Sequence, residues 1–312
     1  MEIRKDYILD RYVFYAPGRK KRKREFKKAE KIKEKGPCFF CPGNENLTPK
    51  EIGRIEEKGE WKIRWFPNKF PVSELKGNAN LRTSGNFFRF ADSYGKHEVI
   101  AECKEHNKQL WDLDVKHIKQ ILDVYRNRIE ELGNLKGVRY VIIFKNHGRE
   151  SGTSLMHSHT QVSAVNIVPS LVQDEVNASK KGRACPYCKV IELERKKSRR
   201  CFENKTIAAF SPYASRFNYE IWIFPKKHLK NLSEFSEEEM SDLADILKKV
   251  LLKLRKLNVS YNFFLHYAPK GTNLHFHIEV TPRIATWGGF EISSDSIINS
   301  VLPEEAARFY RS

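Results

Sequence analysis

Two cysteine pairs and two histidine pairs are the residues of this sequence whose types and spacing could do chemistry. The pairs are Cys38/Cys41 and Cys185/Cys188 among the cysteines, and His157/His159 and His275/His277 among the histidines. Thiolates and neutral imidazoles are the ligands of closed, four-coordinate structural zinc sites. One Cys-x-x-Cys pair alone is weak evidence for zinc. Two pairs, each followed at a matching place by His-x-His, predict a metal site in each half of the chain.

A further histidine follows a strand-like run in each half, His106 in the first and His228 in the second. Two thiolates with two imidazoles complete a tetrahedral site. We therefore predict that one zinc is bound by Cys38, Cys41, His106 and His157, and another by Cys185, Cys188, His228 and His275. The alternative is that one or both cysteine pairs are free thiols. Cys103 and Cys201 are expected to be ordinary, partly buried thiols.

The second histidine of each pair remains for other work, and only His159 stands where chemistry is suggested. It follows the polar, glycine-containing run NHGRESGTS (146–154), and Gln161 comes two residues later, where the second half has Glu279. Backbone N–H groups and hydroxyls of such a loop can hold phosphate oxygens. Imidazole can attack phosphorus near neutral pH, and a neutral amide can donate to a phosphoryl oxygen without acting as an acid. The pattern favours a covalent intermediate that waits for a second substrate.

The elements that position these residues occur twice along the chain. The first half runs PCFFC (37–41), HEVIAECKEH (97–106), VRYVIIFKN (138–146) and HSHTQV (157–162), and the second runs ACPYC (184–188), YEIWIFPKKH (219–228), VSYNFFLHY (259–267) and HFHIEV (275–280). The preserved order indicates a duplicated unit. We predict an α+β chain of two tandem units, residues 1–170 and 171–312, each an antiparallel sheet with one long helix, forming a pseudo-symmetric whole.

Local patterns predict the helices and strands of each unit. Residues 111–132 and 235–257 have apolar side chains at helical spacing. Asp114 and Ser236 stand where the helix N-caps should be, and Glu239 completes a capping-box pattern with Ser236. EVIAE, RYVIIF, EIWIF and YNFFL are strand-like. Because successive strand residues face opposite sides, both histidines of a His-x-His pair should share one face.

Composition limits the class of protein. The 312 residues are 40% hydrophobic, enough for a sizeable core, and the net charge is +18. Eleven of the 57 basic residues lie between Arg19 and Lys35, with three acidic ones. Such a run is either a solvated charge cluster or a contact for a polyanion. No apolar stretch is long enough to cross a membrane, and MEIRKDYILD is no signal sequence, so a cytoplasmic protein without a membrane partner is expected.

The combination of motifs resembles the galactose-1-phosphate uridylyltransferases, the transferase branch of the histidine-triad superfamily. The resemblance is carried, in the family's order, by DRYVFYAPGRKKR, CFFCPGNE, RWFPNKFP, HEVIAE, EHNKQL, NHGRESGTSLMHSHTQ, HFHIEVTPR and IINSVLPEEAA. It implies two histidine-triad-like units. It also implies a ping-pong nucleotidyltransferase that moves UMP from UDP-glucose to galactose 1-phosphate through a covalent uridylyl-histidine.

The resemblance also assigns roles to individual residues. The family's nucleophile falls on His159 and its glutamine on Gln161. Its phosphate-loop residues fall on Asn146, Gly152 and Ser154, its nucleotide contacts on Arg19, Arg22 and Asn68, and a contact with the acceptor sugar on Glu291. In the family this C-terminal segment often enters the site of a partner subunit, so the resemblance implies a homodimer.

Two departures from the family's usual pattern bear on the metal and the substrate. Many bacterial members build the second metal site, which can hold iron, from a glutamate and three histidines. Here Glu175, His266, His275 and His277 could supply that set. The presence of Cys185 and Cys188 favours the two-zinc variant instead. Phe290 stands where the family has tyrosine, which removes a hydroxyl that could help to bind the sugar phosphate.

Rival functions remain at this stage. The nearest is a relative that uses ADP-glucose or another nucleotide sugar, including phosphorylases that transfer the nucleotide to inorganic phosphate. A hydrolase of dinucleoside polyphosphates usually has histidine in place of Gln161. A zinc module that binds nucleic acid through residues 19–35 gives no reason for the duplicated His-x-His, so we expect nucleotide sugars and hexose 1-phosphates as partners, and no nucleic acid.

Overall fold

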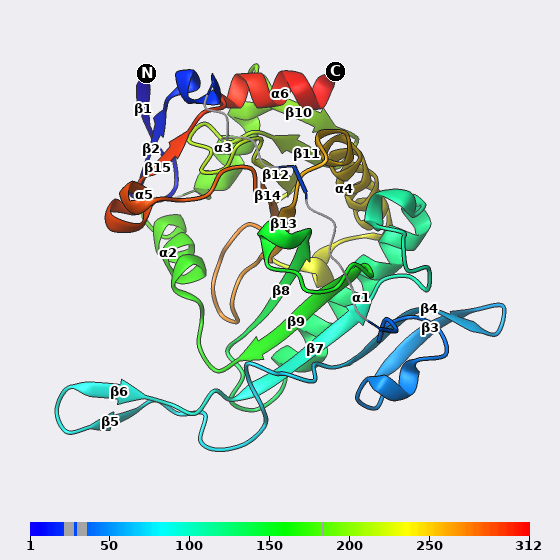
Figure 1. The fold of residues 1–312 in the computed structure, drawn as a ribbon. Coiled ribbons are helices and arrows are strands. Elements are labelled where there is room, and N and C mark those ends of the chain that lie inside the picture. Colours follow the sequence, from blue (N-terminus) through cyan, green and yellow to red (C-terminus); the bar gives the residue numbers. More distant parts are fainter. Residues whose placement is uncertain (22–27, 30–35, 183) are drawn as a thin grey trace.

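The computed structural model of the chain describes residues 1–21, 28–29, 36–182 and 184–312. Its centre is an antiparallel sheet of ten strands in the order β10-β11-β12-β14-β13-β8-β9-β7-β4-β3 (Figure 1). These strands are β3 (Gly53–Glu57), β4 (Glu60–Pro67), β7 (Gly95–Ala101), β8 (Tyr140–His147), β9 (His159–Val165), β10 (Arg200–Glu203), β11 (Ile207–Phe210), β12 (Ile221–Pro225), β13 (Tyr261–His266) and β14 (His277–Pro282). The α+β class predicted from the sequence is confirmed.

The two halves of the chain share this sheet through one pairing. Strand β8 of the first half lies beside β13 of the second, with Phe144 opposite Phe264 and His147 opposite Tyr261. From this junction outward the first half places β8, β9, β7, β4 and β3, and the second places β13, β14, β12, β11 and β10. The order matches strand for strand. That the halves are copies of one ancestral unit stays a prediction.

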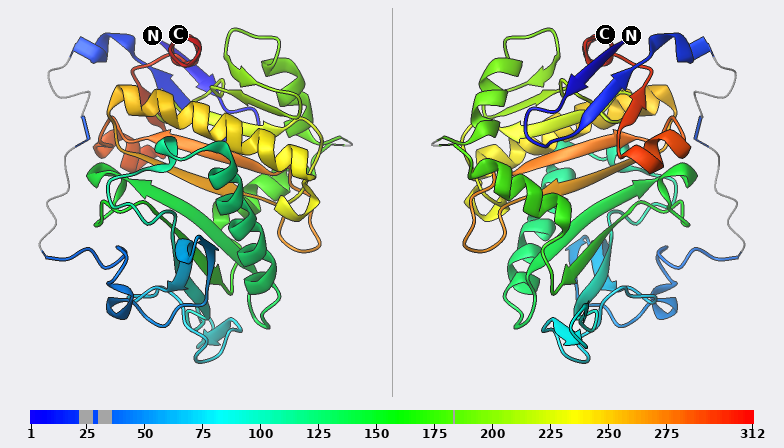
Figure 2. Two further views of the ribbon diagram at one scale, coloured as in Figure 1. Left: turned by 90° about the vertical axis from the view of Figure 1, so that its right-hand side faces the viewer. Right: turned by 90° about the vertical axis from the view of Figure 1, so that its left-hand side faces the viewer.

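Two long helices cover one face of the sheet, α1 (Val115–Gly133) and α4 (Glu237–Leu257) (Figure 2). Asp114 caps α1 by accepting from the backbone N–H of His117 at 2.7 Å. Ser236 and Glu239 form the capping box of α4. Both helices and both caps were predicted from the sequence and are confirmed. Their apolar sides pack on the sheet, and the large buried core lies between the layers.

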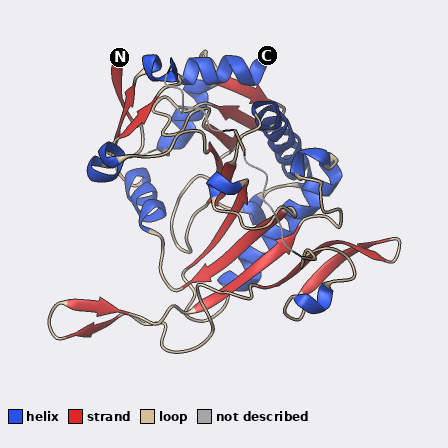
Figure 3. Cartoon of the chain, in the orientation of Figure 1, coloured by secondary structure: helices blue, strands red, loops and turns tan. Residues whose placement is uncertain are grey.

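The remaining α-helices and strands lie outside the ten-stranded sheet and its two long helices, and Figure 3 distinguishes helices from strands by colour. They are β1 (Glu2–Lys5), β2 (Tyr12–Tyr15), β15 (Ile297–Asn299), α2 (Ser170–Ser179), α3 (Pro186–Glu194), α5 (Gly289–Ser294), α6 (Pro303–Arg311) and the hairpin β5 (Arg82–Ser84) and β6 (Phe88–Phe90). Strands β1, β2 and β15 form a separate small sheet. The β5–β6 hairpin projects away from the body (Figure 1). The final helix expected after Pro303 is α6.

The structure bears on two sequence-based expectations, which concern membrane-spanning helices and the basic run of residues 19–35. No helix within the described ranges is long and apolar enough to cross a membrane. Most of the basic run lies outside the described residues. Its first residues, Arg19 to Lys21, end a short 3-10 turn (Pro17–Lys21), and Lys20 makes an ion pair with Glu305.

Candidate active site and metal centres

The first group of metal-capable side chains gathers between the turn before β3 and the ends of β7 and β9. The ligand atoms of Cys38, Cys41, His106 and His157 all lie within 4.8 Å of one another. His157 Nδ1 is 3.6 Å from both sulfur atoms, and His106 Nδ1 is 3.4 Å from Cys41 Sγ. Tetrahedral zinc with its usual N and S bond lengths places neighbouring ligands about 3.5 Å apart, so this spacing fits zinc. His157 Nε2 donates to the Cys103 carbonyl at 2.7 Å, which turns Nδ1 toward the thiols.

A second group repeats this geometry in the other half. Its members are Cys185, Cys188, His228 and His275, with ligand atoms again within 4.8 Å of one another. Cys188 Sγ lies 3.4 Å from Nδ1 of each imidazole. The other ring nitrogen of His275 donates to the Pro225 carbonyl at 2.9 Å, as His157 does to Cys103. Both ligand sets predicted from the sequence are therefore brought together, and the chemistry of each fits zinc.

A third group lies deeper in the second half and combines carboxylates with histidines. It consists of Glu175, His266, His277 and Glu279, all buried. His266 Nδ1 is 3.0 Å from Glu175 Oε1, and His277 Nε2 is 3.6 Å from Glu279 Oε1. The alternative ligand set considered from the sequence does not gather as a whole, because His275 faces the cysteines. Glu279 stands in its place beside His277.

His159 is buried beside the first metal group, at the start of β9. Its Nδ1 lies 2.8 Å from the carbonyl oxygen of His157, and a carbonyl only accepts, so Nδ1 carries the hydrogen. The lone pair of this imidazole is therefore on Nε2. Burial, together with the nearby charge of Lys145, lowers the pKa of His159 to about 4. The ring is neutral at pH 7, as a nucleophile must be.

Strands β9 and β14 begin at the second histidine of each pair, so the first histidine lies just before its strand. The Phe40 ring contacts both His157 and His159, with centroids 6.0 and 5.4 Å away, so both imidazoles lie on one side. In the second half the Phe224 ring contacts both His275 and His277, with centroids 5.6 and 4.9 Å away. In each pair the first imidazole thus points toward the cysteines, and the second lies beside the first.

Gln161 is held by His97, a residue to which the sequence analysis gave no role. The backbone N–H of Val72 donates to His97 Nδ1 at 3.3 Å, which leaves the ring hydrogen on Nε2. His97 Nε2 then donates to Gln161 Oε1 at 3.0 Å. This bond uses only the Gln161 oxygen, so the Gln161 NH2 group can donate to another acceptor, such as a ligand oxygen. Asn68 lies beside this cluster, with Nδ2 3.3 Å from His97 Nε2, but with the ring hydrogen on Nε2 this is a contact between two donors and not a hydrogen bond.

The loop between β8 and β9 borders a hollow of about 180 Å³ beside His159. Asn146 lines this hollow, and its side chain accepts a hydrogen bond from Asn262 across the junction of the two halves at 2.7 Å. Gly152 has φ 89°, a conformation that favours glycine. Gly152 and Ser154 are exposed, in keeping with a loop that receives a ligand. The structure therefore brings Asn146 and His159 to one hollow, while Gln161 lies two residues after His159 on the same face of β9.

Arg19 and Glu291 lie instead at the small sheet. Arg19 follows β2, whose neighbour β15 directly follows α5, the helix that carries Glu291. Glu291 Oε2 accepts from the Gly288 backbone N–H at 2.8 Å. The Phe290 ring meets Phe14 of β2 at 5.4 Å. Arg22 lies outside the described residues.

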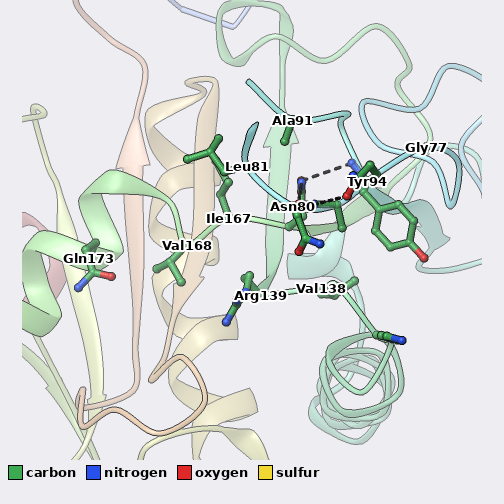
Figure 4. A pocket seen from close by; sticks show the side chains of 15 residues that line it. Gly77, Asn80, Leu81, Ala91, Tyr94, Val138, Arg139, Ile167, Val168 and Gln173 are labelled. Carbon is green, nitrogen blue, oxygen red and sulfur yellow. Dashed lines mark hydrogen bonds between the residues drawn. The ribbon is translucent and has the colours of Figure 1, made fainter. Parts of the chain in front are cut away.

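A cavity of about 870 Å³ lies apart from the hollow beside His159. It opens at the other ends of β8 and β9, near the base of the β5–β6 hairpin, where Arg139, Asn80, Tyr94 and Gln173 contribute side chains (Figure 4). Its lining holds no nucleophile beside a base, so its size does not make it the catalytic centre.

Comparison with known proteins identifies the family. Residues 2–169 match the family model described as the galactose-1-phosphate uridyl transferase N-terminal domain. The chain belongs to the galactose-1-phosphate uridylyltransferase family. Residues 102–308 also match a domain of unknown function, DUF4921.

Two curated relatives in this family match nearly the whole chain. The ADP-glucose phosphorylase of Arabidopsis thaliana is 31% identical over 99% of this chain and 92% of its own length. The galactose-1-phosphate uridylyltransferase of Thermotoga maritima is also 31% identical, over 100% of this chain and 98% of its own. A crystal structure of the Arabidopsis thaliana ADP-glucose phosphorylase with bound ADP-glucose aligns with a TM-score of 0.85 and 28% identity, over 100% of this chain and 98% of that one. These relatives support a nucleotidyltransferase acting on nucleotide sugars.

Several site residues of this family member have no motif that could have marked them. His97 stands at the head of a strand-like block, where a single histidine is usually structural. Glu279 occupies the position that matches Gln161, and that correspondence was the available signal for it. Glu102 and Lys145 come directly after the apolar runs VIA (99–101) and VIIF (141–144), and nothing in the sequence says which partners they meet.

Proposed function

We propose that this chain transfers a uridylyl group from UDP-glucose to galactose 1-phosphate through a covalent bond to His159. The observation that carries the proposal is the hydrogen bond from His159 Nδ1 to the His157 carbonyl. It fixes the tautomer and leaves Nε2 as a nucleophile in a buried, neutral ring. Gln161, oriented by His97, supplies an amide donor two residues along the same strand face.

In the first half-reaction His159 Nε2 attacks the α-phosphorus. The bond from that phosphorus to the bridging oxygen breaks, and glucose 1-phosphate leaves with the electron pair. The Gln161 NH2 group donates to an oxygen of the phosphoryl group as negative charge shifts there. In the second half-reaction a phosphate oxygen of galactose 1-phosphate attacks the same phosphorus, the N–P bond breaks, and neutral His159 is regenerated.

The two Cys–His groups would each hold a structural zinc ion. Four protein ligands close such a site and leave no position for substrate. The zinc at Cys38, Cys41, His106 and His157 would fix the backbone carbonyl that orients His159. We assign no step of the reaction to either metal.

A second candidate function is transfer of AMP from ADP-glucose to inorganic phosphate. The Arabidopsis thaliana ADP-glucose phosphorylase is as similar in sequence as the Thermotoga maritima transferase. Phe290, which lacks the tyrosine hydroxyl expected near the sugar phosphate, also favours an acceptor other than a hexose phosphate. The chemistry at His159 is the same in both cases.

The test is a rapid-mixing experiment with labelled UDP-glucose and, in parallel, labelled ADP-glucose. We expect a burst of glucose 1-phosphate and one acid-labile nucleotide retained per active site. Galactose 1-phosphate and inorganic phosphate are then compared as acceptors of the trapped nucleotide. The mechanism fails if neither sugar nucleotide gives an adduct, or if the adduct persists in His159→Ala.

A homodimer would complete the site, because Arg19 and Glu291 lie at the small sheet. Beside Glu291, the side chains of Phe290 and Ile292 are 46% and 76% exposed, and a second copy would cover them. Light scattering should give twice the chain mass of 36.6 kDa. A monomer with full transferase activity would contradict this arrangement.

A further inference from the structure

A fully buried ion pair lies behind His159, on the face of the sheet that α1 covers. Lys145 of β8 and Glu102, just after β7, have side chains that are 1% and 0% exposed. Lys145 Nζ is 2.6 Å from Glu102 Oε2. Burial would raise the pKa of Glu102, but the Lys145 charge and hydrogen bonds from Lys145, Ser158 and Thr160 lower it below its usual value. The pair is therefore charged within the core.

This pair holds three consecutive residues of the segment that carries the nucleophile. Lys145 Nζ donates at 3.0 Å to the carbonyl of His159 and at 3.0 Å to Ser158 Oγ. With Glu102 as the third acceptor, all three ammonium hydrogens are used. The other Glu102 oxygen accepts from Thr160 Oγ1 at 2.6 Å. Residues 158, 159 and 160 are thus each tied to the same buried pair.

The backbone geometry explains why a side chain is needed at this point. The carbonyl of Ser158 accepts from the Glu102 N–H on the β7 side. Neighbouring strand residues direct their carbonyls to opposite sides, so the His159 carbonyl points toward β8. The ladder between β8 and β9 ends at Phe144 opposite Gln161, before it reaches His159. Lys145 takes the place of the missing backbone donor.

The second half of the chain shows that the fold itself does not require these polar groups. At the positions matching Ser158 and Thr160, His277 is flanked by Phe276 and Ile278, both fully buried in the hydrophobic core. The same strand geometry is therefore built there with apolar neighbours. Buried ion pairs in general add little to stability compared with apolar replacements. The buried ion pair and the two hydroxyls bonded to it are therefore found around His159, and apolar side chains stand in place of the hydroxyls around His277.

We infer that Lys145 and Glu102 are positioning residues that hold His159 in line for attack on the phosphorus. The inference deepens the proposed function and rests on it. Lys145 borders the hollow beside His159, but both side chains are at most 1% exposed and the Lys145 ammonium is used by three protein acceptors, so neither residue is placed to bind the substrate. They act through the backbone of His159 and through the hydroxyls on either side of it. A displacement of about 1 Å at a nucleophile can cost on the order of 100-fold in rate.

The test compares two neutralised ion pairs in the full chain. Lys145→Met with Glu102→Gln removes the pair behind His159 without leaving a single buried charge. Arg128→Met with Glu98→Gln does the same to a buried pair between α1 and β7, where Arg128 Nε is 2.8 Å from Glu98 Oε2. For each protein we measure melting temperature, zinc content, nucleotide-sugar affinity, and the single-turnover rate of glucose 1-phosphate release at saturating substrate.

We expect the Lys145/Glu102 variant to fold, keep its zinc and bind the nucleotide sugar with affinity within threefold of wild type. Its single-turnover rate should fall about 100-fold. The Arg128/Glu98 variant should keep the wild-type rate within threefold. Equal rates for the Lys145/Glu102 variant and wild type, or an equal loss in both variants, would overturn the inference and leave the proposed function standing. Absence of an adduct in wild type would overturn both.

A second variant keeps the inference testable if the first does not fold. Ser158→Ala with Thr160→Val leaves the ion pair in place and removes the two hydroxyls that tie it to the segment. We expect about a tenfold slower single turnover with unchanged substrate affinity. An unchanged rate in this folded variant would count against the inference.

Discussion

His97 shows how a residue without a motif can control one that has a motif. Because its Nε2–H donates to Gln161 Oε1, the amide of Gln161 cannot rotate without losing that bond. The orientation decides whether Gln161 presents hydrogen-bond donors or an acceptor to a phosphoryl oxygen. A reversed amide would repel the charge that develops there.

Replacing His97 with Phe should therefore slow the chemical step. We expect kcat to fall about 10- to 100-fold, less than the roughly 100- to 1,000-fold found when such a donor is removed outright, because the Gln161 amide itself remains. The measurement is a double-mutant cycle with Gln161→Ala. If His97 acts through Gln161, the second substitution adds no further loss. Independent, multiplicative losses would show that His97 acts in another way.

His147 should make the stability of the protein depend on pH. Burial, with the nearby charge of Lys145, lowers the pKa of His147 to about 3, against 6.5 for the free ring. Between these values the unfolded chain binds a proton that the folded chain does not, so the free energy of unfolding falls as pH falls from 6.5. At pH 5 the loss should reach about 2 kcal/mol.

His147→Phe keeps a ring against Trp111 and Tyr261 and removes the titration. Urea unfolding at pH 7 and pH 5 measures the effect. Wild type should lose about 2 kcal/mol more than the variant between the two conditions. The same loss in both proteins would mean that His147 is protonated in the folded state.

At the scale of the elements, α4 offers a simple test of capping. The Ser236 side chain accepts from the Glu239 N–H, and the Glu239 carboxylate accepts from the Ser236 N–H at 2.8 Å. Ser236→Ala should lower the free energy of unfolding by about 1 kcal/mol. Ser241→Ala in the same helix is the matched control. It should change stability by a few tenths of a kcal/mol, because alanine is the better helix former there. Equal losses would argue against the cap.

The elements could be predicted well from the sequence because each has a short-range signal. The apolar spacing of 111–132 and 235–257 indicated α1 and α4, and the cap residues marked where they begin. The two Cys–His groups could be predicted because thiols and imidazoles recurred in the same order. What could not be predicted depends on register between distant strands. Lys145 meets Glu102, and His97 meets Gln161, only because β7, β8 and β9 are neighbours in one sheet.

At the scale of the whole molecule, the two halves share one strand order but surround their second histidines, His159 and His277, with different side chains. In each half, the first histidine faces two thiols and the second donates to the carbonyl of the first. His159 is then flanked by hydroxyls and adjoins Gln161. His277 is flanked by apolar side chains and faces Glu175 and Glu279. The two halves, with the same strand order, thus carry the proposed nucleophile in one and a closed ionic cluster in the other.

This asymmetry predicts different effects when each proposed zinc is removed. Cys38→Ser and Cys188→Ser should each lose one of two zinc ions per chain, as measured by elemental analysis. Loss of the first ion frees His157, whose carbonyl orients His159, so single-turnover release of glucose 1-phosphate should slow at least about 10-fold. Loss of the second ion loosens α3 and His275, which lie away from the nucleophile. That variant should melt at a lower temperature but keep the wild-type rate per folded molecule.

The Glu–His cluster supplies the internal check on this prediction. If a third equivalent of metal is found and disappears in Glu175→Gln, the cluster also binds metal, and the count of two must be revised. Equal slowing of single turnover in Cys38→Ser and Cys188→Ser, with both proteins folded, would contradict the asymmetry. It would mean that the second metal acts on His159 across the β8–β13 junction, where Asn262 donates to Asn146 at 2.7 Å.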